Sequence, residues 1–198
     1  MFSPDLVERV VFESYTFLAR TAKIHAFLAP LAGHFATDRL SALAHARNPQ
    51  EGSVPQVLFV DEEDANRSQV AAALLAHYAQ GAVVARSAGF AAGEAVDSIA
   101  VEMLVERGIE PPNLYPKPVT DDVVRAADLV ITFGASDGIR VYPGTTHEHW
   151  CVGGLLTAST RERAREVVDA IDTRVTNLWE QIHAQATPTA STTSHRTG

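Results

Sequence analysis

Four acidic residues directly follow an apolar run in the segment VLFVDEEDANRSQ, residues 57–69. They are Asp61, Glu62, Glu63 and Asp64. Arg67 and Ser68 come next and open an Ala-rich stretch typical of a helix. A tight loop entering a helix N-terminus points backbone N–H groups at one spot, where the helix dipole adds positive potential. The sequence therefore places four carboxylates in a loop suited to binding an anion.

The acidic run has three interpretations. In the first, one carboxylate accepts hydrogen bonds from the loop's own N–H groups beside Arg67, which makes it a poor base and leaves a protein without catalysis. In the second, the crowded carboxyl groups cannot all stay ionised, so at least one acts as a general acid or base, or attacks carbon. Asp61, at the end of the predicted strand, would then be the reacting group, and Arg67 would orient it or a substrate oxygen.

The third interpretation is a hard cation such as Mg²⁺ or Ca²⁺, bound by two of the acids and Asp137. Four adjacent acids rarely converge on one ion, because consecutive side chains point in different directions. His147, His149 and Cys151 alternate and would share one face of a strand, as half of a zinc site would. Polar loop residues beside a buried Trp150 are the simpler explanation, so we expect neither a metal nor a cofactor.

Composition restricts the class of protein. Of the 198 residues, 46% are hydrophobic, which is ample for a buried core. A net charge of −8 argues against nonspecific binding of nucleic acid or of an anionic membrane. Without an apolar run of membrane-spanning length or a signal pattern, we expect a cytoplasmic protein whose partner is a small-molecule ligand or substrate. The single cysteine, Cys151, excludes an internal disulfide.

The chain divides into a helical part and an alternating part. Residues 1–48 are predicted to form an all-helical N-terminal domain, in which two short helices after the first are separated by a break near Gly33. We expect a linker at 49–55, an α/β domain at 56–186 and a disordered tail at 187–198. In the α/β domain, short Val-rich runs typical of buried parallel strands alternate with helical patterns. The predicted fold class is α/β, a small parallel sheet with helices on both faces.

The N-terminal helices carry many aromatic residues for their length: Phe12, Tyr15, Phe17, Phe27 and Phe35. A segment this short cannot be expected to bury all of them alone. Packing onto the rest of the same chain is the simplest solution. The alternatives are a lid over the acidic loop or a homodimer through these helices.

Several segments, in order, resemble the low-molecular-weight protein tyrosine phosphatase family, and specifically its thioredoxin-coupled arsenate reductase branch. They are VLFV, ANRSQVAAALLAHYAQG, ARSAGF, YPKPVTDDVVRAADLVITFG, VYPG and EHW, and the resemblance covers about residues 55–185. The N-terminal helices resemble a helical extension found on some actinobacterial arsenate reductases. The resemblance implies a phosphatase-like α/β fold with a phosphate-binding loop after the first strand.

The residues that carry the chemistry of this family are replaced. Asp61 stands at the nucleophilic cysteine of the phosphate loop. The later cysteine pair of the arsenate reductases corresponds to Ala135 and Ile139, and the general-acid aspartate corresponds to Gly154. Phosphoryl transfer in this family needs a thiolate and an acid, and arsenate reduction needs a resolving thiol as well. We therefore expect neither activity.

Other loop positions are kept or changed mildly. Arg67 and Ser68 match the family, and Ser87 resembles a position that supports the loop. Asn66 replaces a common glycine, and Asn tolerates a positive φ better than most residues. Tyr142 and Trp150 are expected to lie in the core or a pocket wall. The candidate ligand-binding residues are Asn66, Ser68, Ser87, Asp137, Tyr142 and Trp150.

These observations favour a phosphatase-fold protein repurposed as an enzyme. Its carboxylates would act on a non-phosphorylated small molecule by isomerisation, cyclisation, dehydration or hydrolysis, as in specialised metabolism. The candidate catalytic residues are Asp61, Glu62, Glu63, Asp64 and Arg67. The alternative is a noncatalytic pseudophosphatase that binds a partner or small ligand. Asp61→Asn would abolish turnover in the first case and be nearly neutral or stabilising in the second.

Overall fold

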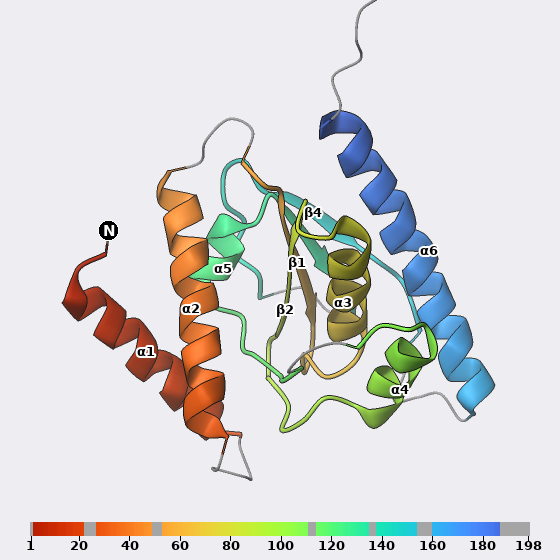
Figure 1. Ribbon diagram of the computed structural model, residues 1–198, viewed down its shortest axis with the longest axis horizontal. Coiled ribbons are helices and arrows are strands. Elements are labelled where there is room, and N and C mark those ends of the chain that lie inside the picture. Colours follow the sequence, from red (N-terminus) through yellow and green to blue (C-terminus); the bar gives the residue numbers. More distant parts are fainter. Residues whose placement is uncertain are drawn as a thin grey trace, which may run out of the picture.

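The computed structural model describes residues 2–21, 27–48, 53–110, 114–134, 138–153 and 160–186. At its centre is a four-stranded parallel sheet with the strand order β2-β1-β3-β4 (Figure 1). The strands are β1 (Gln56–Asp61), β2 (Val84–Gly89), β3 (Leu129–Thr132) and β4 (Thr146–His149). The predicted α/β class with a small parallel sheet is confirmed.

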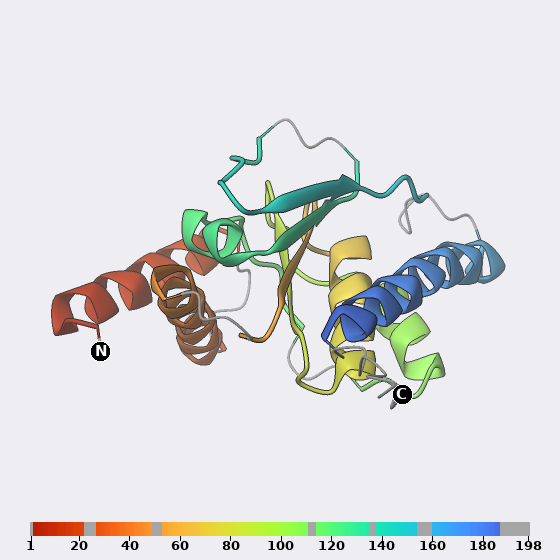
Figure 2. The same ribbon diagram turned by 90° about the horizontal axis from the view of Figure 1, so that it is seen from above.

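Helices cover both faces of this sheet (Figure 1, Figure 2). On one face lie α3 (Arg67–Ala79), α4 (Ser98–Glu106) and α6 (Arg161–Ala186), and on the other lie α5 (Asp121–Ala126) and α2 (Leu28–Arg47). Successive side chains of β1 point to opposite faces, so Phe59 joins the first core and Leu58 joins the second. Because both faces are covered, β1 is buried throughout, and its four inner residues, 57–60, are all apolar.

The second N-terminal helix corrects one prediction. The break expected near Gly33 is absent, because α2 runs without interruption from Leu28 to Arg47. A glycine inside a helix costs only about 1 kcal/mol relative to alanine. Burial of Ala32, Phe35 and Ala36 on either side of Gly33 outweighs that cost. The stretch before α2, residues 22–26, lies outside the described residues.

A buried arginine joins the N-terminal helices to the sheet domain. Arg39 on α2 donates from Nε to Asp122 Oδ2 of α5 at 2.8 Å, and both side chains are almost fully buried. The same guanidinium donates to Ser14 Oγ at 3.2 Å and to Glu13 Oε2 at 3.0 Å, both on α1 (Pro4–Ala19). This one side chain therefore bridges α1, α2 and α5.

The aromatic residues of these helices are only partly covered. Phe35 is buried and Phe17 packs against it, as expected for packing onto the same chain. Phe12 and Phe27 remain largely exposed, at 70% and 69%, and Tyr15 is exposed at 43%. The lid and the homodimer both remain predictions.

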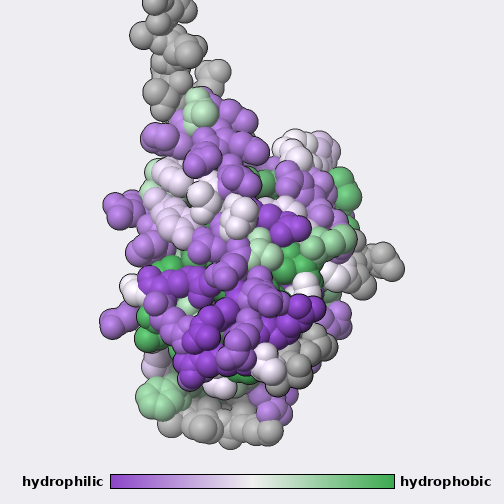
Figure 3. Space-filling model, turned by 90° about the vertical axis from the view of Figure 1, so that its right-hand side faces the viewer, coloured by the Kyte–Doolittle hydropathy of each residue, from purple (hydrophilic) through white to green (hydrophobic). Residues whose placement is uncertain are grey.

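The sequence from Arg161 to about Gln185 predicts one long helix whose buried face is marked by five apolar residues: Val168, Ile171, Val175, Leu178 and Ile182. The first four are buried against the first core, and Ile182 is partly buried against it. The outer side of the molecule here is mainly hydrophilic, as the view onto α6 shows (Figure 3). Among the described helices, none combines the length and apolarity that a membrane span requires.

Candidate functional site

The acidic loop connects β1 to α3 at the carboxyl edge of the sheet, where open α/β folds bind ligands. Its backbone is fixed against the segment that follows β2. Amide groups within residues 90–97 donate hydrogen bonds of 2.7 to 3.2 Å to the carbonyl oxygens of residues 61, 62, 63 and 65. The carbonyl oxygen of Asp64 accepts a further bond from Gln69 Nε2 at 3.0 Å. The loop therefore has a single, well-supported backbone path.

Gly89, the last residue of β2, makes this close packing sterically feasible. A Cβ atom at position 89 would lie 2.5 Å from the backbone nitrogen of Asp64 and 2.6 Å from the carbonyl carbon of Glu63. Real Cβ atoms do not approach backbone atoms so closely, so any side chain at this position would displace the loop.

Asp61 turns its carboxylate inward, onto the N–H groups of its own loop. Oδ1 accepts a hydrogen bond from the backbone nitrogen of Asp64 at 2.6 Å, and Oδ2 accepts one from the backbone nitrogen of Ser68 at 3.1 Å. The residue is only 2% exposed. A carboxylate bonded to backbone N–H groups at a helix start is held strongly. Asp61 thus uses two donors of the anion-binding loop.

Asp64 has a different and equally internal role. It adopts a φ of 50°, which lets the loop turn back, and Asp is one of the few non-glycine residues that tolerate this region. Its Oδ1 accepts from Ser68 Oγ at 3.0 Å, and its Oδ2 accepts from the backbone nitrogen of Lys117 at 2.8 Å. Complete burial raises the pKa of the Asp64 carboxyl, and the nearby Lys117 ammonium and the contact with Ser87 oppose this effect.

The ammonium group of Lys117 neutralises this buried acid. Its Nζ lies 3.1 Å from Asp64 Oδ2 and donates to Ser87 Oγ at 3.1 Å and to the carbonyl oxygen of Tyr115 at 3.0 Å. These three partners match the three N–H donors of an ammonium group. Ser87 therefore lies behind the loop, next to the ion pair that supports it.

Asn66 closes the loop as the N-cap of α3. Its Oδ1 accepts from the backbone nitrogen of Arg67 at 2.6 Å. The sequence suggested that asparagine replaces glycine at position 66 because it tolerates a positive φ. This explanation is wrong, because the φ of Asn66 is −143° and the positive φ in the loop belongs to Asp64. Side chains of the loop itself thus accept the N–H groups of residues 64, 67 and 68.

Arg67 makes its side-chain hydrogen bonds after the ends of β3 and β4, and none with Asp61 among the described residues. Its Nη1 donates to the carbonyl oxygen of Val152 at 3.2 Å, and its Nη2 donates to that of Phe133 at 3.4 Å. The guanidinium carbon lies 5.7 Å from the centre of the Phe133 ring. Among the described residues, its buried Nε has no hydrogen-bond partner.

The four acids therefore divide into two inward and two outward side chains. Asp61 and Asp64 are buried, whereas Glu62 and Glu63 are exposed to solvent at the rim of the loop. The carbonyl oxygens of Glu62 and Glu63 are bonded to the backbone nitrogens of Ala91 and Gly93, so these two carboxylates extend from a fixed backbone.

Two further candidates lie away from the inner face of the loop. Trp150 packs edge-on against Phe59 and Phe133, and its Nε1 donates to Glu148 Oε2 at 3.1 Å, so it is a core residue. Tyr142 donates its hydroxyl to Asp121 on α5. Its ring stacks under the Arg125 guanidinium, 4.5 Å from the ring centre.

The cation interpretation gains no geometric support. Within the described ranges, no group of three or more His, Cys, Asp or Glu side chains is arranged to hold a metal ion. His149 Nδ1 lies 3.0 Å from Thr132 Oγ1, and Cys151 is exposed. Asp137, the proposed third ligand, lies outside the described residues, as do Ala135 and Gly154.

Two contributors were not identified from the sequence. Lys117 supplies the counter-charge of Asp64, and Gln69 bridges the carbonyl oxygens of Asp64 and Tyr115. One feature of the sequence could have drawn attention to Lys117. It is one of only two lysines in the sequence, whose other basic residues, apart from histidines, are arginines.

Comparisons with known proteins agree with the fold. The family described as low molecular weight phosphotyrosine protein phosphatase matches residues 56–187, and a protein-tyrosine-phosphatase-like N-terminal domain matches residues 1–44. A thioredoxin-dependent arsenate reductase from Corynebacterium glutamicum is 43% identical, with a TM-score of 0.82 over 93% of this chain and 89% of that chain. An arsenate reductase from Archaeoglobus fulgidus is 26% identical, with a TM-score of 0.53 over 63% of this chain and 98% of that chain.

Proposed function

Because the chain belongs to the low molecular weight phosphotyrosine protein phosphatase family, we propose that it is a noncatalytic member, which binds rather than transforms its ligand. The observation that carries the proposal is the position of Asp61. Its carboxylate is buried and accepts the N–H groups of Asp64 and Ser68, where a phosphatase loop would keep its donors for an oxyanion. The loop thus holds an internal anion in place of an external one.

The same geometry makes Asp61 a poor catalyst. An acid or base must reach the proton that it transfers, and a nucleophile must reach the reacting atom. At 2% exposure, with both oxygens engaged, Asp61 can do neither without leaving its donors. We therefore place the noncatalytic alternative ahead of the Asp61-centred enzyme that the sequence alone favours.

The number of cysteines supports the proposal that this chain does not reduce arsenate by an internal thiol relay. The similar Corynebacterium protein is a thioredoxin-dependent arsenate reductase. Internal thiol relay requires at least two cysteines, because one thiolate attacks and a second resolves the product as a disulfide. This chain contains one cysteine, Cys151, and it lies after β4 rather than in the loop.

A second candidate function rests on the outward acids. Glu62 and Glu63 are exposed carboxylates on a fixed backbone, at the sheet edge where ligands bind in this class of fold. If the protein is a carboxylate enzyme, these two residues, rather than Asp61, are the groups that a substrate can reach.

Two assays test the proposal on the purified full-length chain. The first measures hydrolysis of p-nitrophenyl phosphate and thioredoxin-coupled reduction of arsenate, by the wild type and by Asp61→Asn. We expect no turnover by either protein. Turnover by the wild type that Asp61→Asn abolishes would overturn the proposal.

The second assay addresses the outward acids. The wild type and Glu62→Gln/Glu63→Gln are incubated with a metabolite extract, and Glu8→Gln on α1 serves as an exposed-acid control. No compound should be consumed by any of the three proteins. A compound consumed by the wild type and by Glu8→Gln, but spared by the double variant, would establish the second candidate instead.

A further inference from the structure

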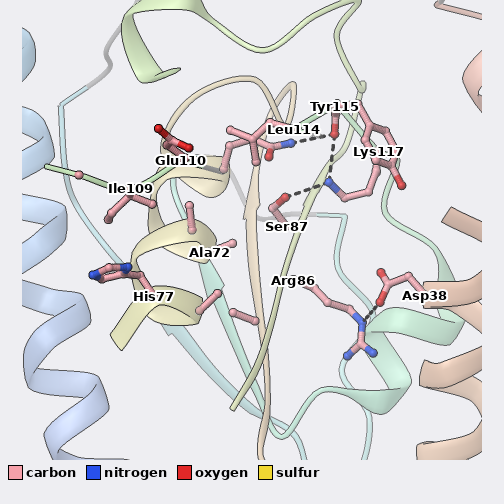
Figure 4. Close-up of a pocket in the computed structure, with 15 residues that line it drawn as sticks. Asp38, Ala72, His77, Arg86, Ser87, Ile109, Glu110, Leu114, Tyr115 and Lys117 are labelled. Carbon is pink, nitrogen blue, oxygen red and sulfur yellow. Dashed lines mark hydrogen bonds and ion pairs between the residues drawn. The ribbon is translucent and has the colours of Figure 1, made fainter. Parts of the chain in front are cut away.

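A cavity of about 500 Å³ lies beside β2, at the edge of the sheet (Figure 4). Its walls come from α3, from β2, from residues 108–110, from Leu114, Tyr115 and Lys117, and from Asp38 on α2. This volume falls within the range of small-molecule sites in proteins. None of residues 61–68 is among those that line it, so its capacity to hold a ligand does not depend on whether the loop is catalytic.

Small side chains create the hollow. Ala72, Ala73 and Ala76 from α3 and Ala85 from β2 form part of the wall, and Ile109 adds apolar surface. Side chains three and four positions apart share one face of a helix, so Ala72, Ala73 and Ala76 leave one continuous shallow strip along α3. A leucine or phenylalanine on this strip would fill the space that the alanines leave open.

The charged groups of the wall are already paired within the protein. Arg86 donates from Nε to Asp38 Oδ1 at 2.6 Å, and Lys117 uses its three donors on Asp64, Ser87 and Tyr115. Figure 4 shows Arg86 with Asp38, and Lys117 with Ser87 and Tyr115, on one side of the cavity. The remaining acid of the wall, Glu110, is exposed. An anionic ligand would compete with Asp38 or Asp64 for its cation, and a cationic ligand would face Arg86 and Lys117.

We propose that this cavity is a binding site for an uncharged, largely apolar organic molecule that lies on the alanine strip of α3. Three properties of the cavity support this assignment: its volume, the apolar strip and the charge of its wall. Arg86 pairs with Asp38, whose side chain is one-third exposed, and Lys117 pairs with the fully buried Asp64 of the loop. A charged ligand would have to displace one of these partners, and displacing Asp64 would leave a buried charge unpaired, so a ligand without charge fits this wall best.

The test uses Nile red, an uncharged apolar dye whose fluorescence rises on leaving water. It is titrated into the full-length wild type, into Ala76→Phe, and into the matched control Ala44→Phe. Both alanines are on helices, and Ala44 lies on α2 outside the cavity wall. Ala73→Leu is a second filling variant, to be used if Ala76→Phe does not fold. We expect one dye per chain, with binding weakened about tenfold or more by the filling variant and unchanged by the control.

Three results would overturn the proposal. Equal weakening by Ala44→Phe would place the dye on a general apolar surface, such as the exposed Phe12 and Phe27. Absence of saturable binding to the wild type would mean that the cavity is not a site for this class of ligand. Tighter binding of the anionic dye 8-anilinonaphthalene-1-sulfonate, lost in Ala76→Phe, would show that the site selects charge.

Discussion

The Oδ1 atom of Asp61 lies 2.6 Å from the backbone nitrogen of Asp64, within a loop of the kind that binds anions from solution. This short contact joins the end of β1 to the turn that precedes α3. Together with the bond to the backbone nitrogen of Ser68, it makes the carboxylate part of the structure of the loop. The Asp61 carboxylate therefore supports the loop from within.

Replacing Asp61 should cost stability in proportion to the acceptors that are lost. Asp61→Ala leaves two buried N–H groups without acceptors, and each such group costs about 1–3 kcal/mol. Asp61→Asn keeps one acceptor oxygen but turns an NH₂ group toward the other donor, so we expect a smaller loss rather than a neutral effect. Urea unfolding of the three proteins gives this order directly. Equal stability of wild type and Asp61→Ala would contradict the placement of the carboxylate.

Gly89 and Gly33 should respond in opposite ways to the same substitution. Gly89→Ala puts a methyl group 2.5 Å from the backbone nitrogen of Asp64, and overpacking of this kind costs about 1–3 kcal/mol. Gly33→Ala meets no atom within 4 Å inside α2 and should stabilise the protein by about 0.5–1 kcal/mol. Midpoints of urea unfolding measure both effects. A tolerated Gly89→Ala would mean that the loop does not pack against β2 as described.

The buried ion pair of Asp64 and Lys117 should show strong coupling. Lys117→Met leaves the fully buried Asp64 without its counter-charge, and a lone buried charge of this kind costs about 3–5 kcal/mol. Adding Asp64→Asn to Lys117→Met removes the orphaned charge, so the double variant should lose less stability than the sum of the two single variants. A double-mutant cycle on unfolding free energies measures this difference. Simple additivity would contradict a direct pair.

Protonation of Asp64 should make the free energy of unfolding depend on pH. Burial raises the folded-state pKa of this carboxyl above its ordinary value of 3.8. Between 3.8 and that raised value, the folded protein holds more protons than the unfolded chain, so stability falls as pH rises. Asp64→Asn lacks this contribution. The unfolding free energy of the wild type minus that of Asp64→Asn should therefore be greatest in acid and decrease as pH rises, and an increase with pH would contradict the raised pKa.

Helices and strands could be predicted from the sequence where the local pattern of apolar residues alone determines them. The apolar run from Val57 to Val60 predicts a strand buried on both faces, and the spacing of Val168, Ile171, Val175 and Leu178 predicts the buried face of α6. Gly33 shows where a local prediction fails. The propensity of one residue favoured a break, but packing of its neighbours on α2 decided the outcome.

The position of the acidic loop in the fold was predictable, but the arrangement of its side chains was not. The position of the acidic run at the end of β1 follows from the fold class, and the inward turn of one carboxylate was one of the interpretations. Two acids turn inward, and the position of the second, Asp64, depends on its positive φ and on its contact with Lys117, 53 positions along the chain. Neither a backbone angle nor a contact over that separation can be read from a run of four acids.

Phosphate binding tests the central claim most directly. Inorganic phosphate is titrated calorimetrically into the wild type, into Glu62→Gln/Glu63→Gln, and into the triple variant that adds Asp61→Ala. The double variant removes the charges of Glu62 and Glu63 but keeps Asp61 on its N–H donors. It therefore distinguishes occupancy of the anion site by Asp61 from repulsion of phosphate by the two exposed carboxylates. If Asp61 occupies the anion site, neither the wild type nor the double variant binds phosphate, and the triple variant does. Phosphate binding by the double variant, with Asp61 intact, would contradict the account.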